Sequence, residues 1–221
     1  MRVSVIADVH CRGSEDSAQR SFVEWVSALD VDELWILGDL FHFGWAFDGC
    51  VQPVFQDVMD ALGDLDRRGC RIVFVPGNHD FGVADLFKDV LNADVRGQHI
   101  RSIDGLRVSL SHGDEFDASW RYRWFRWGVR SRLFASLINA LGPKRGSSVL
   151  KRMAGDVSVG GALWERSRES IMEMLEDSDL VLMGHVHTPW SYTGNDGTAL
   201  VLTPGVPILI EDGVLVTERP G

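Results

Sequence analysis

Eight side chains of the types that bind metal ions or move protons follow short apolar runs of this chain. They come from five separate segments: Asp8 with His10, Asp39, Asn78 with His79, His112, and His185 with His187. Short apolar runs are typical of buried strands. Because open α/β sheets place ligands at the carboxyl ends of their strands, we expect the five segments to converge.

The mixture of imidazole, carboxylate and amide donors indicates transition-metal ions. Borderline divalent ions such as Mn, Fe, Zn or Co bind such mixtures, whereas sites for Ca or Mg use few histidines. Two ions need about six to eight protein ligands, and a carboxylate can bridge them at roughly 3.5 to 4 Å. The set therefore predicts a dinuclear centre.

The surrounding segments predict an α/β fold with a mostly parallel, helix-covered sheet. Strands are expected at residues 3–7, 34–37 and 71–75, and helices at residues 14–29, 53–67 and 84–91. Strands that alternate with helices are typical of parallel sheets. The sequence Gly77-Asn78 after the third strand predicts a tight turn with positive φ, since both residues tolerate that conformation.

After residue 91 the pattern changes. Asp104-Gly105 predicts a hairpin turn between two short strands. The later elements are expected as strands at residues 100–103 and 106–110, a helix at 162–175, a strand at 180–183, and two strand pairs that turn at 194–197 and 211–213.

Residues 115–155 lack a strand pattern and predict two helices broken at Gly142-Pro143, inserted over the sheet as a cap. The net charge of the chain is −10, yet residues 118–155 contain nine basic residues and no acidic one. Aromatic and aliphatic residues interleave with them, as in interfacial amphipathic elements. The alternative is an ordinary helical lid whose arginines pair with the acidic body.

Length and composition bound the remaining possibilities. With 221 residues, 45% apolar and 24% charged, the chain fits one globular domain, residues 1–221, with the cap inside it. It shows no signal-peptide pattern and no apolar stretch of roughly 20 residues, so we expect a cytoplasmic protein, at most peripheral on a membrane. Three scattered cysteines favour neither disulfides nor a zinc cage, and Cys11 is expected to be apolar filler.

The motifs D-x-H, G-D, G-N-H-D, H and G-H-x-H occur complete and in order over residues 3–187. This set resembles the calcineurin-like metallophosphoesterase superfamily. The resemblance implies a four-layer α/β/β/α sandwich, hydrolysis of a phosphoester, and two metal ions, with Mn favoured over Fe, Zn or Co. It implies that one ion is held by Asp8, His10 and His187, the other by Asn78, His112 and His185, and that Asp39 bridges them.

The resemblance leaves His79 beside the metals. Its imidazole could protonate the leaving oxygen, because the reference pKa of histidine is close to neutral, and Asp80 could orient the ring. His42 has two interpretations, a residue facing the cleft beside Asp39 or a loop histidine among aromatics. His99, which belongs to no motif, is expected to be structural.

Within the superfamily, residues 39–41, residues 111–114 and the cap resemble UDP-2,3-diacylglucosamine hydrolases. That family acts in lipid A synthesis and splits a pyrophosphate in a UDP-linked, two-chain glycolipid at the cytoplasmic membrane face, releasing UMP and the lipid monophosphate. The resemblance implies an anionic membrane surface as a partner, and substrate contacts from Arg121, Tyr122, Arg126, Arg130 and His42. Members often have Arg at the position of His79 and an acid at that of His42; these departures concern the substrate and not the metal chemistry.

Two rival hypotheses remain at this stage. A phosphodiesterase or phosphatase acting on nucleotides, phosphoproteins or nucleic acid would use the same centre, with the cap tracking a phosphate backbone. A scaffold that kept the fold and lost catalysis would lack metal ligands, whereas all seven are present here.

Overall fold

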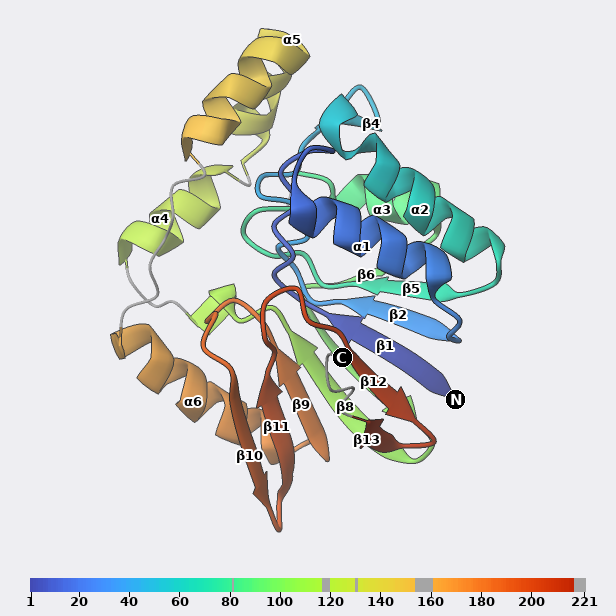
Figure 1. Ribbon diagram of the computed structural model, residues 1–221. Coiled ribbons are helices and arrows are strands. Elements are labelled where there is room, and N and C mark those ends of the chain that lie inside the picture. Colours follow the sequence, from blue (N-terminus) through green and yellow to red (C-terminus); the bar gives the residue numbers. More distant parts are fainter. Residues whose placement is uncertain (81, 117–119, 130, 154–160, 217–221) are drawn as a thin grey trace.

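In the computed structural model, two β-sheets pack face to face and helices cover both outer faces (Figure 1). The structure describes residues 1–80, 82–116, 120–129, 131–153 and 161–216, apart from the side chains of residues 121–123, 125, 126, 132, 151, 153 and 161–164.

The first sheet has the strand order β13-β12-β1-β2-β5-β6. Its strands are β1 (Arg2–Ile6), β2 (Glu33–Ile36), β5 (Arg71–Phe74), β6 (Asp94–Val95), β12 (Ile208–Glu211) and β13 (Val214–Val216). The neighbours from β1 to β6 are parallel, while β12 runs antiparallel to β1. The outer face is covered by α1 (Ser17–Ala28), α2 (Gln56–Arg67) and α3 (Ala84–Leu91), in the blue to green part of Figure 1.

The second sheet has the strand order β10-β11-β9-β8-β7. Its strands are β7 (Gln98–Ile103), β8 (Leu106–Ser111), β9 (Leu180–Met183), β10 (Trp190–Gly194) and β11 (Gly197–Val201). Helix α6 (Gly161–Leu175) lies on the outer face of this sheet (Figure 1). Because β8 and β9 are parallel, the segments that follow them begin at the same edge of the sheet.

Three apolar layers hold the sandwich together. Phe22, Leu62 and Phe87 lie between the helices and the first sheet. Trp35 and Leu182 belong to the layer between the two sheets. Each large side chain that is fully buried contributes about 1.5 to 3 kcal/mol of transfer free energy. With a third layer between α6 and the second sheet, the predicted four-layer α/β/β/α order is confirmed.

Short elements connect the layers. These are β3 (Ala46–Phe47), β4 (Cys50–Val51), η1 (Pro53–Phe55) and η2 (Asp114–Phe116). Helix α1 begins after Asp16, whose carboxylate accepts a hydrogen bond from the backbone N–H of Gln19. Such a cap satisfies one of the backbone donors at a helix start.

The cap consists of α4 (Trp120–Val129) and α5 (Arg132–Met153), which lie to one side of the sandwich in Figure 1. Gly142 has a φ of 70° and interrupts α5, so the predicted break is found, but α4 is a further separate helix. Ile138 and Leu150 pack on the loop after β2. There the indole N–H of Trp45 donates to Asn139 at 2.9 Å. Within the described residues, no helix combines the length and apolarity needed to cross a bilayer.

Candidate metal centre

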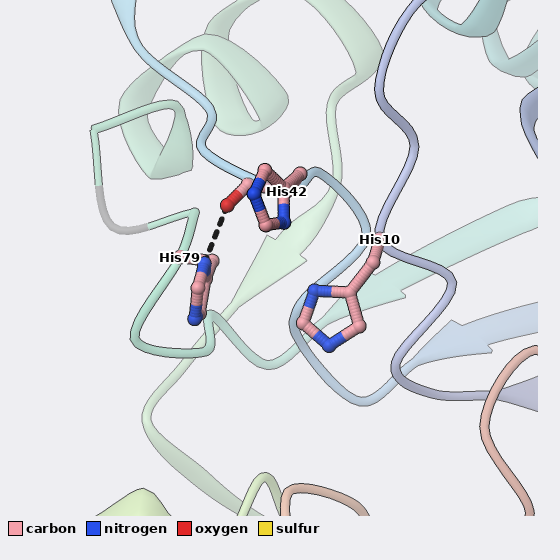
Figure 2. A group of neighbouring side chains, drawn as sticks. All are labelled: His10, His42 and His79. Atoms are coloured by element: carbon pink, nitrogen blue, oxygen red, sulfur yellow. Dashed lines mark hydrogen bonds between the residues drawn. The ribbon is translucent and has the colours of Figure 1, made fainter. Parts of the chain in front are cut away.

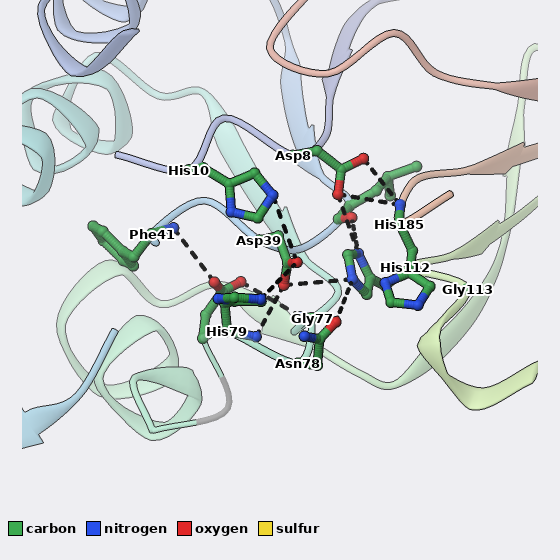
Figure 3. A network of polar contacts seen from close by, with 12 residues as sticks. Asp8, His10, Asp39, Phe41, Gly77, Asn78, His79, His112, Gly113 and His185 are labelled. Carbon is green, nitrogen blue, oxygen red and sulfur yellow. Dashed lines mark hydrogen bonds and ion pairs between the residues drawn. The ribbon is translucent and has the colours of Figure 1, made fainter. Parts of the chain in front are cut away.

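The five predicted segments converge at the carboxyl ends of strands from both sheets (Figure 3). Asp8 and His10 follow β1, Asp39 follows β2, and Asn78 and His79 follow β5. The second sheet supplies the rest from the ends of β8 and β9, namely His112, His185 and His187. The predicted convergence is therefore seen in the structure.

The side chains form two groups of potential ligands. In one group, the ligand atoms of Asp8, His10 and His187 lie within 4.8 Å of one another. In this group the Nε2 atoms of His10 and His187 are 3.1 Å apart. This is the trio that the resemblance assigned to one ion.

The second group contains Asp39, His112 and His185, whose ligand atoms also lie within 4.8 Å of one another. Asn78 adjoins it, since its Oδ1 is 3.3 Å from Nε2 of His112. His112 is fixed from its other side, where Nδ1 lies 2.8 Å from the carbonyl oxygen of Leu37. A histidine held in this way presents its remaining nitrogen in a fixed direction, as metal ligands usually do.

Asp39 lies between the two groups. Its Oδ2 is 3.8 Å from Nε2 of His10, and its Oδ1 is 3.4 Å from Nε2 of His112. The two oxygens of one carboxylate thus face different groups, which suits a ligand that bridges two ions.

Five of these residues adopt a left-handed backbone conformation, which residues other than glycine rarely adopt. The φ angles are 54° at Asp8, 52° at His10, 50° at Asp39, 66° at His185 and 56° at His187. Left-handed residues of this kind cost about 1 to 3 kcal/mol each and cluster at functional sites. The sequence instead predicts positive φ at Gly77 and Asn78.

Gly77 and Asn78, where positive φ was predicted, are not among the residues with positive φ, so that prediction is wrong. Gly77 is needed for a different reason, because a Cβ there would collide with the carboxylate of Asp39. Gly38, whose φ is 79°, would likewise meet the ring of His112. Glycine therefore allows backbone and ligands to approach closely.

The pKa values of the site residues are set by burial and by the close pairing of carboxylates with imidazoles. Burial alone would raise the pKa of Asp39, but the imidazole of His112 opposes it and the net pKa lies below the usual range. Burial disfavours the imidazolium of His112, yet Asp39 and Asp8 raise its pKa above the ordinary value. Burial lowers the pKa of His10 and of His185 to about 4. Both are then neutral near pH 7, which is the form of histidine that binds metals.

The predicted contact between Asp80 and the ring of His79 is not found. Nδ1 of His79 instead contacts the main-chain oxygen of His42. The Asp80 carboxyl group accepts hydrogen bonds from the backbone N–H groups of Phe41 and Gly77, each at 3.4 Å. Burial and the nearby Asp39 raise the pKa of Asp80 to about 8. Asp80 therefore connects the loops that follow β2 and β5, and the carbonyl group of His42 orients the ring of His79.

His79 itself lies where the sequence placed it, beside the predicted ligands. Its Nε2 is 3.9 Å from Oδ2 of Asp39, and its backbone N–H donates to Oδ1 of the same residue at 2.9 Å. The ring of His42 is 5.8 Å from that of His79 and 6.2 Å from that of His10, centroid to centroid. Of the two interpretations of His42, the structure favours the one that faces the site.

The remaining predicted residues are the substrate-binding candidates of the cap and Cys11. Arg130 lies outside the described residues, as do the side chains of Arg121, Tyr122 and Arg126, so their substrate contacts stay predictions. Cys11 is buried and burial raises the pKa of its thiol, which agrees with an apolar filler.

Comparisons with known proteins agree with this geometry. A family model described as calcineurin-like phosphoesterase matches residues 1–189. The chain is 27% identical, over 245 residues, to a UDP-2,3-diacylglucosamine hydrolase of Aeromonas hydrophila, covering 100% of this chain and 96% of that protein. Relatives with the same name in Photorhabdus laumondii and Ralstonia nicotianae are 27% and 25% identical; the alignments cover 84% and 98% of this chain, and 81% and 91% of those proteins.

Proposed function

This chain belongs to the calcineurin-like phosphoesterase family, and from that premise we propose that it hydrolyses the pyrophosphate of a UDP-linked diacylated glucosamine lipid, giving UMP and the lipid 1-phosphate. As a member of the family it is a metal-dependent phosphoester hydrolase. The observation that carries the chemistry is the pair of ligand groups joined by Asp39. The lipid substrate rests on the names of the relatives and on the surface of the cap.

The donor set fits two divalent transition-metal ions, with manganese as our first choice. One ion would be held by Asp8, His10 and His187, the other by Asn78, His112 and His185, with Asp39 between them. When bound, two such cations acidify a water molecule and neutralise charge on the phosphoryl oxygens.

The protein's own contribution to bond cleavage centres on His79. The contact between its Nδ1 and the carbonyl oxygen of His42 fixes the ring and leaves Nε2 beside Asp39. Because Nδ1 donates to a carbonyl oxygen, Nε2 carries a proton only in the imidazolium form of His79. That proton can pass to the leaving oxygen, which would otherwise depart with an unfavourable negative charge. The main-chain oxygen of His42, and not Asp80, thus orients the ring of His79.

The cap supplies an apolar surface that suits a lipid. Trp120, Trp124 and Trp127 on α4 have exposed fractions of 68%, 65% and 69%, and Leu133 and Leu137 on α5 are exposed as well. Tryptophan, leucine and arginine on one element are typical of helices that lie in a membrane interface. We propose that this surface meets acyl chains and an anionic cytoplasmic membrane face.

The basic residues of the cap complete the proposal. Arg121, Tyr122, Arg126 and Arg130 would meet the phosphates, because guanidinium groups bind phosphate through paired hydrogen bonds. The cap packs on the loop that follows Asp39, through Trp45 and its bond to Asn139. A lipid held by the cap would therefore lie next to the metal ligands.

The direct test incubates purified, manganese-loaded protein with UDP-2,3-diacylglucosamine in detergent micelles and measures released UMP. Flotation with anionic and neutral vesicles tests the membrane contact in parallel. Release of UMP, with flotation on anionic vesicles only, supports the proposal. Cleavage of aryl phosphodiesters but not of the lipid would reject the lipid substrate and leave the enzyme class intact. Salt-sensitive binding to single-stranded nucleic acid, without flotation, would favour a phosphodiesterase that acts on nucleic acid.

A further inference from the structure

Three histidines form a cluster beside the predicted ion pair. One ligand atom from each of His10, His42 and His79 lies within 4.8 Å of the other two (Figure 2). Only His10 belongs to the seven predicted metal ligands. The imidazoles of His42 and His79 therefore add two nitrogen donors that the dinuclear centre does not use.

His10 offers a nitrogen to each side. Its Nε2 faces the ion pair, 3.1 Å from Nε2 of His187 and 3.8 Å from Oδ2 of Asp39. Its Nδ1 is buried and has no hydrogen-bond partner within the described part of the chain. Figure 2 shows this nitrogen pointing toward the other two rings. A ligand histidine normally gives its second nitrogen a partner, and a buried polar atom without one costs about 1 to 3 kcal/mol.

The other two rings are placed to share an occupant with it. His79 has Nδ1 engaged by the main-chain oxygen of His42, which leaves Nε2 for a ligand. The rings of His10 and His79 are 5.2 Å apart and nearly perpendicular, at 87°. Rings in this orientation meet edge to face and do not stack, and Nδ1 of His10 points toward the ring of His79 (Figure 2).

We propose that His10, His42 and His79 form a third cation site, selective for zinc, whose occupation inhibits the enzyme. Zinc binds imidazole at about 2.0 to 2.1 Å in a tetrahedron, which brings the nitrogens to roughly 3.3 Å from one another. The ligand atoms now lie within 4.8 Å of one another, and side-chain rotation would bring them to that separation when the ion binds. Three imidazoles with water as the fourth ligand suit zinc, whereas manganese prefers oxygen donors.

Inhibition, which rests on the proposed function, follows from what the third ion would occupy. It would take Nε2 of His79, so that this ring could no longer protonate the leaving oxygen. It would also take Nδ1 of His10, which would release its ring proton so that one ion binds each nitrogen, and it would weaken the hold of that residue on the catalytic pair. Asp8, His187 and Asp39 would remain for the first catalytic ion.

The site is tested by metal stoichiometry, independently of turnover. Metal-free protein is dialysed against buffered zinc and analysed for bound metal, in wild type, His42→Asn and the control His99→Asn, which changes a histidine outside the cluster. We expect three zinc ions per chain in wild type and in the control, and two in His42→Asn. The loss of one of three ligands should weaken the third site by at least about tenfold, since even the loss of a supporting hydrogen bond does so.

Two zinc ions in wild type, or three in folded His42→Asn, would overturn the proposal. Should His42→Asn fail to fold, cobalt titration of the wild type decides, because a third equivalent in a tetrahedral nitrogen site gives an intense visible absorption and a six-coordinate one does not. Turnover is measured on protein with two and with three zinc ions. Turnover should fall when the third ion binds, and equal turnover at both loadings would overturn the inhibition. Protein that can bind three ions but hydrolyses the lipid at neither loading refutes the proposed function and leaves the third site standing.

Discussion

Replacing Asp39 by asparagine removes one negative charge from the centre with almost no change in volume. Asparagine tolerates the left-handed backbone, with φ of 50° here, and its amide oxygen can still accept the bond from the backbone N–H of His79. The fold should therefore survive. The variant loses the carboxylate whose oxygens lie 3.8 Å from His10 and 3.4 Å from His112, and with it the charge between the two ions.

The size of the effect follows from the charge that is lost. Two opposite unit charges about 4 Å apart attract by roughly 4 kcal/mol at an effective dielectric constant of 20. If the amide oxygen recovers about a quarter of that, the loss is about 3 kcal/mol, or about a hundredfold to a thousandfold in kcat. We expect the variant to bind fewer than two manganese ions.

The assay compares kcat, bound manganese and the thermal midpoint of wild type with those of Asp39→Asn. The matched control is Asp212→Asn, which makes the same substitution at a residue with the same φ of 50°, in the exposed turn between β12 and β13. The control should keep full activity and two ions. A folded Asp39→Asn protein within about threefold of wild-type kcat would refute the bridging role, since 1.36 kcal/mol already corresponds to tenfold.

Three further predictions concern residues around this centre. His79→Gln should lower kcat by about a hundredfold to ten-thousandfold and leave two manganese ions bound, because it removes a proton donor and not a ligand; loss of a metal would contradict that role. Trp124→Ser combined with Trp127→Ser should abolish flotation on anionic vesicles and leave the thermal midpoint unchanged, since both side chains are exposed; unchanged flotation would place the membrane contact elsewhere. Burial lowers the pKa of His99 from 6.5, so the unfolded chain takes up the proton at a higher pH than the folded chain does. The free energy of unfolding of wild type, measured in urea, should therefore fall as pH falls below 6.5, and His99→Asn should make this dependence weaker. An equal pH dependence in both proteins would contradict the prediction.

Most elements could be predicted because each is specified locally. The helix at Ala84–Leu91 and the strand at Leu180–Met183 have the predicted bounds, since apolar periodicity and flanking turns lie within a few residues. The strand predicted at residues 34–37 is Glu33–Ile36 in the structure, a shift of one residue. The split of the strands into two sheets depends on pairing between distant segments, and it came from the family resemblance alone.

The sequence predicted which residues form the site, but not their backbone conformations or all of their contacts. The family resemblance implied that Asp8 and His187 would hold the same ion, and the two residues do meet in the structure although they are far apart in the chain. Local propensity placed the left-handed backbone at Gly77-Asn78, whereas Asp8 and His187 adopt it, because the surrounding packing sets the conformation that directs each side chain at the centre. The contact of His79 with a carbonyl oxygen carries no sequence signal at all.

The proposed hydrolysis depends on two neighbouring cations, gathered by loops from both sheets. The most direct test titrates metal-free protein with manganese while measuring bound metal and UMP release on the same samples. We predict that activity is absent in the metal-free protein and reaches its maximum at two ions per chain. Full turnover in protein that holds less than one metal ion per chain would contradict the account.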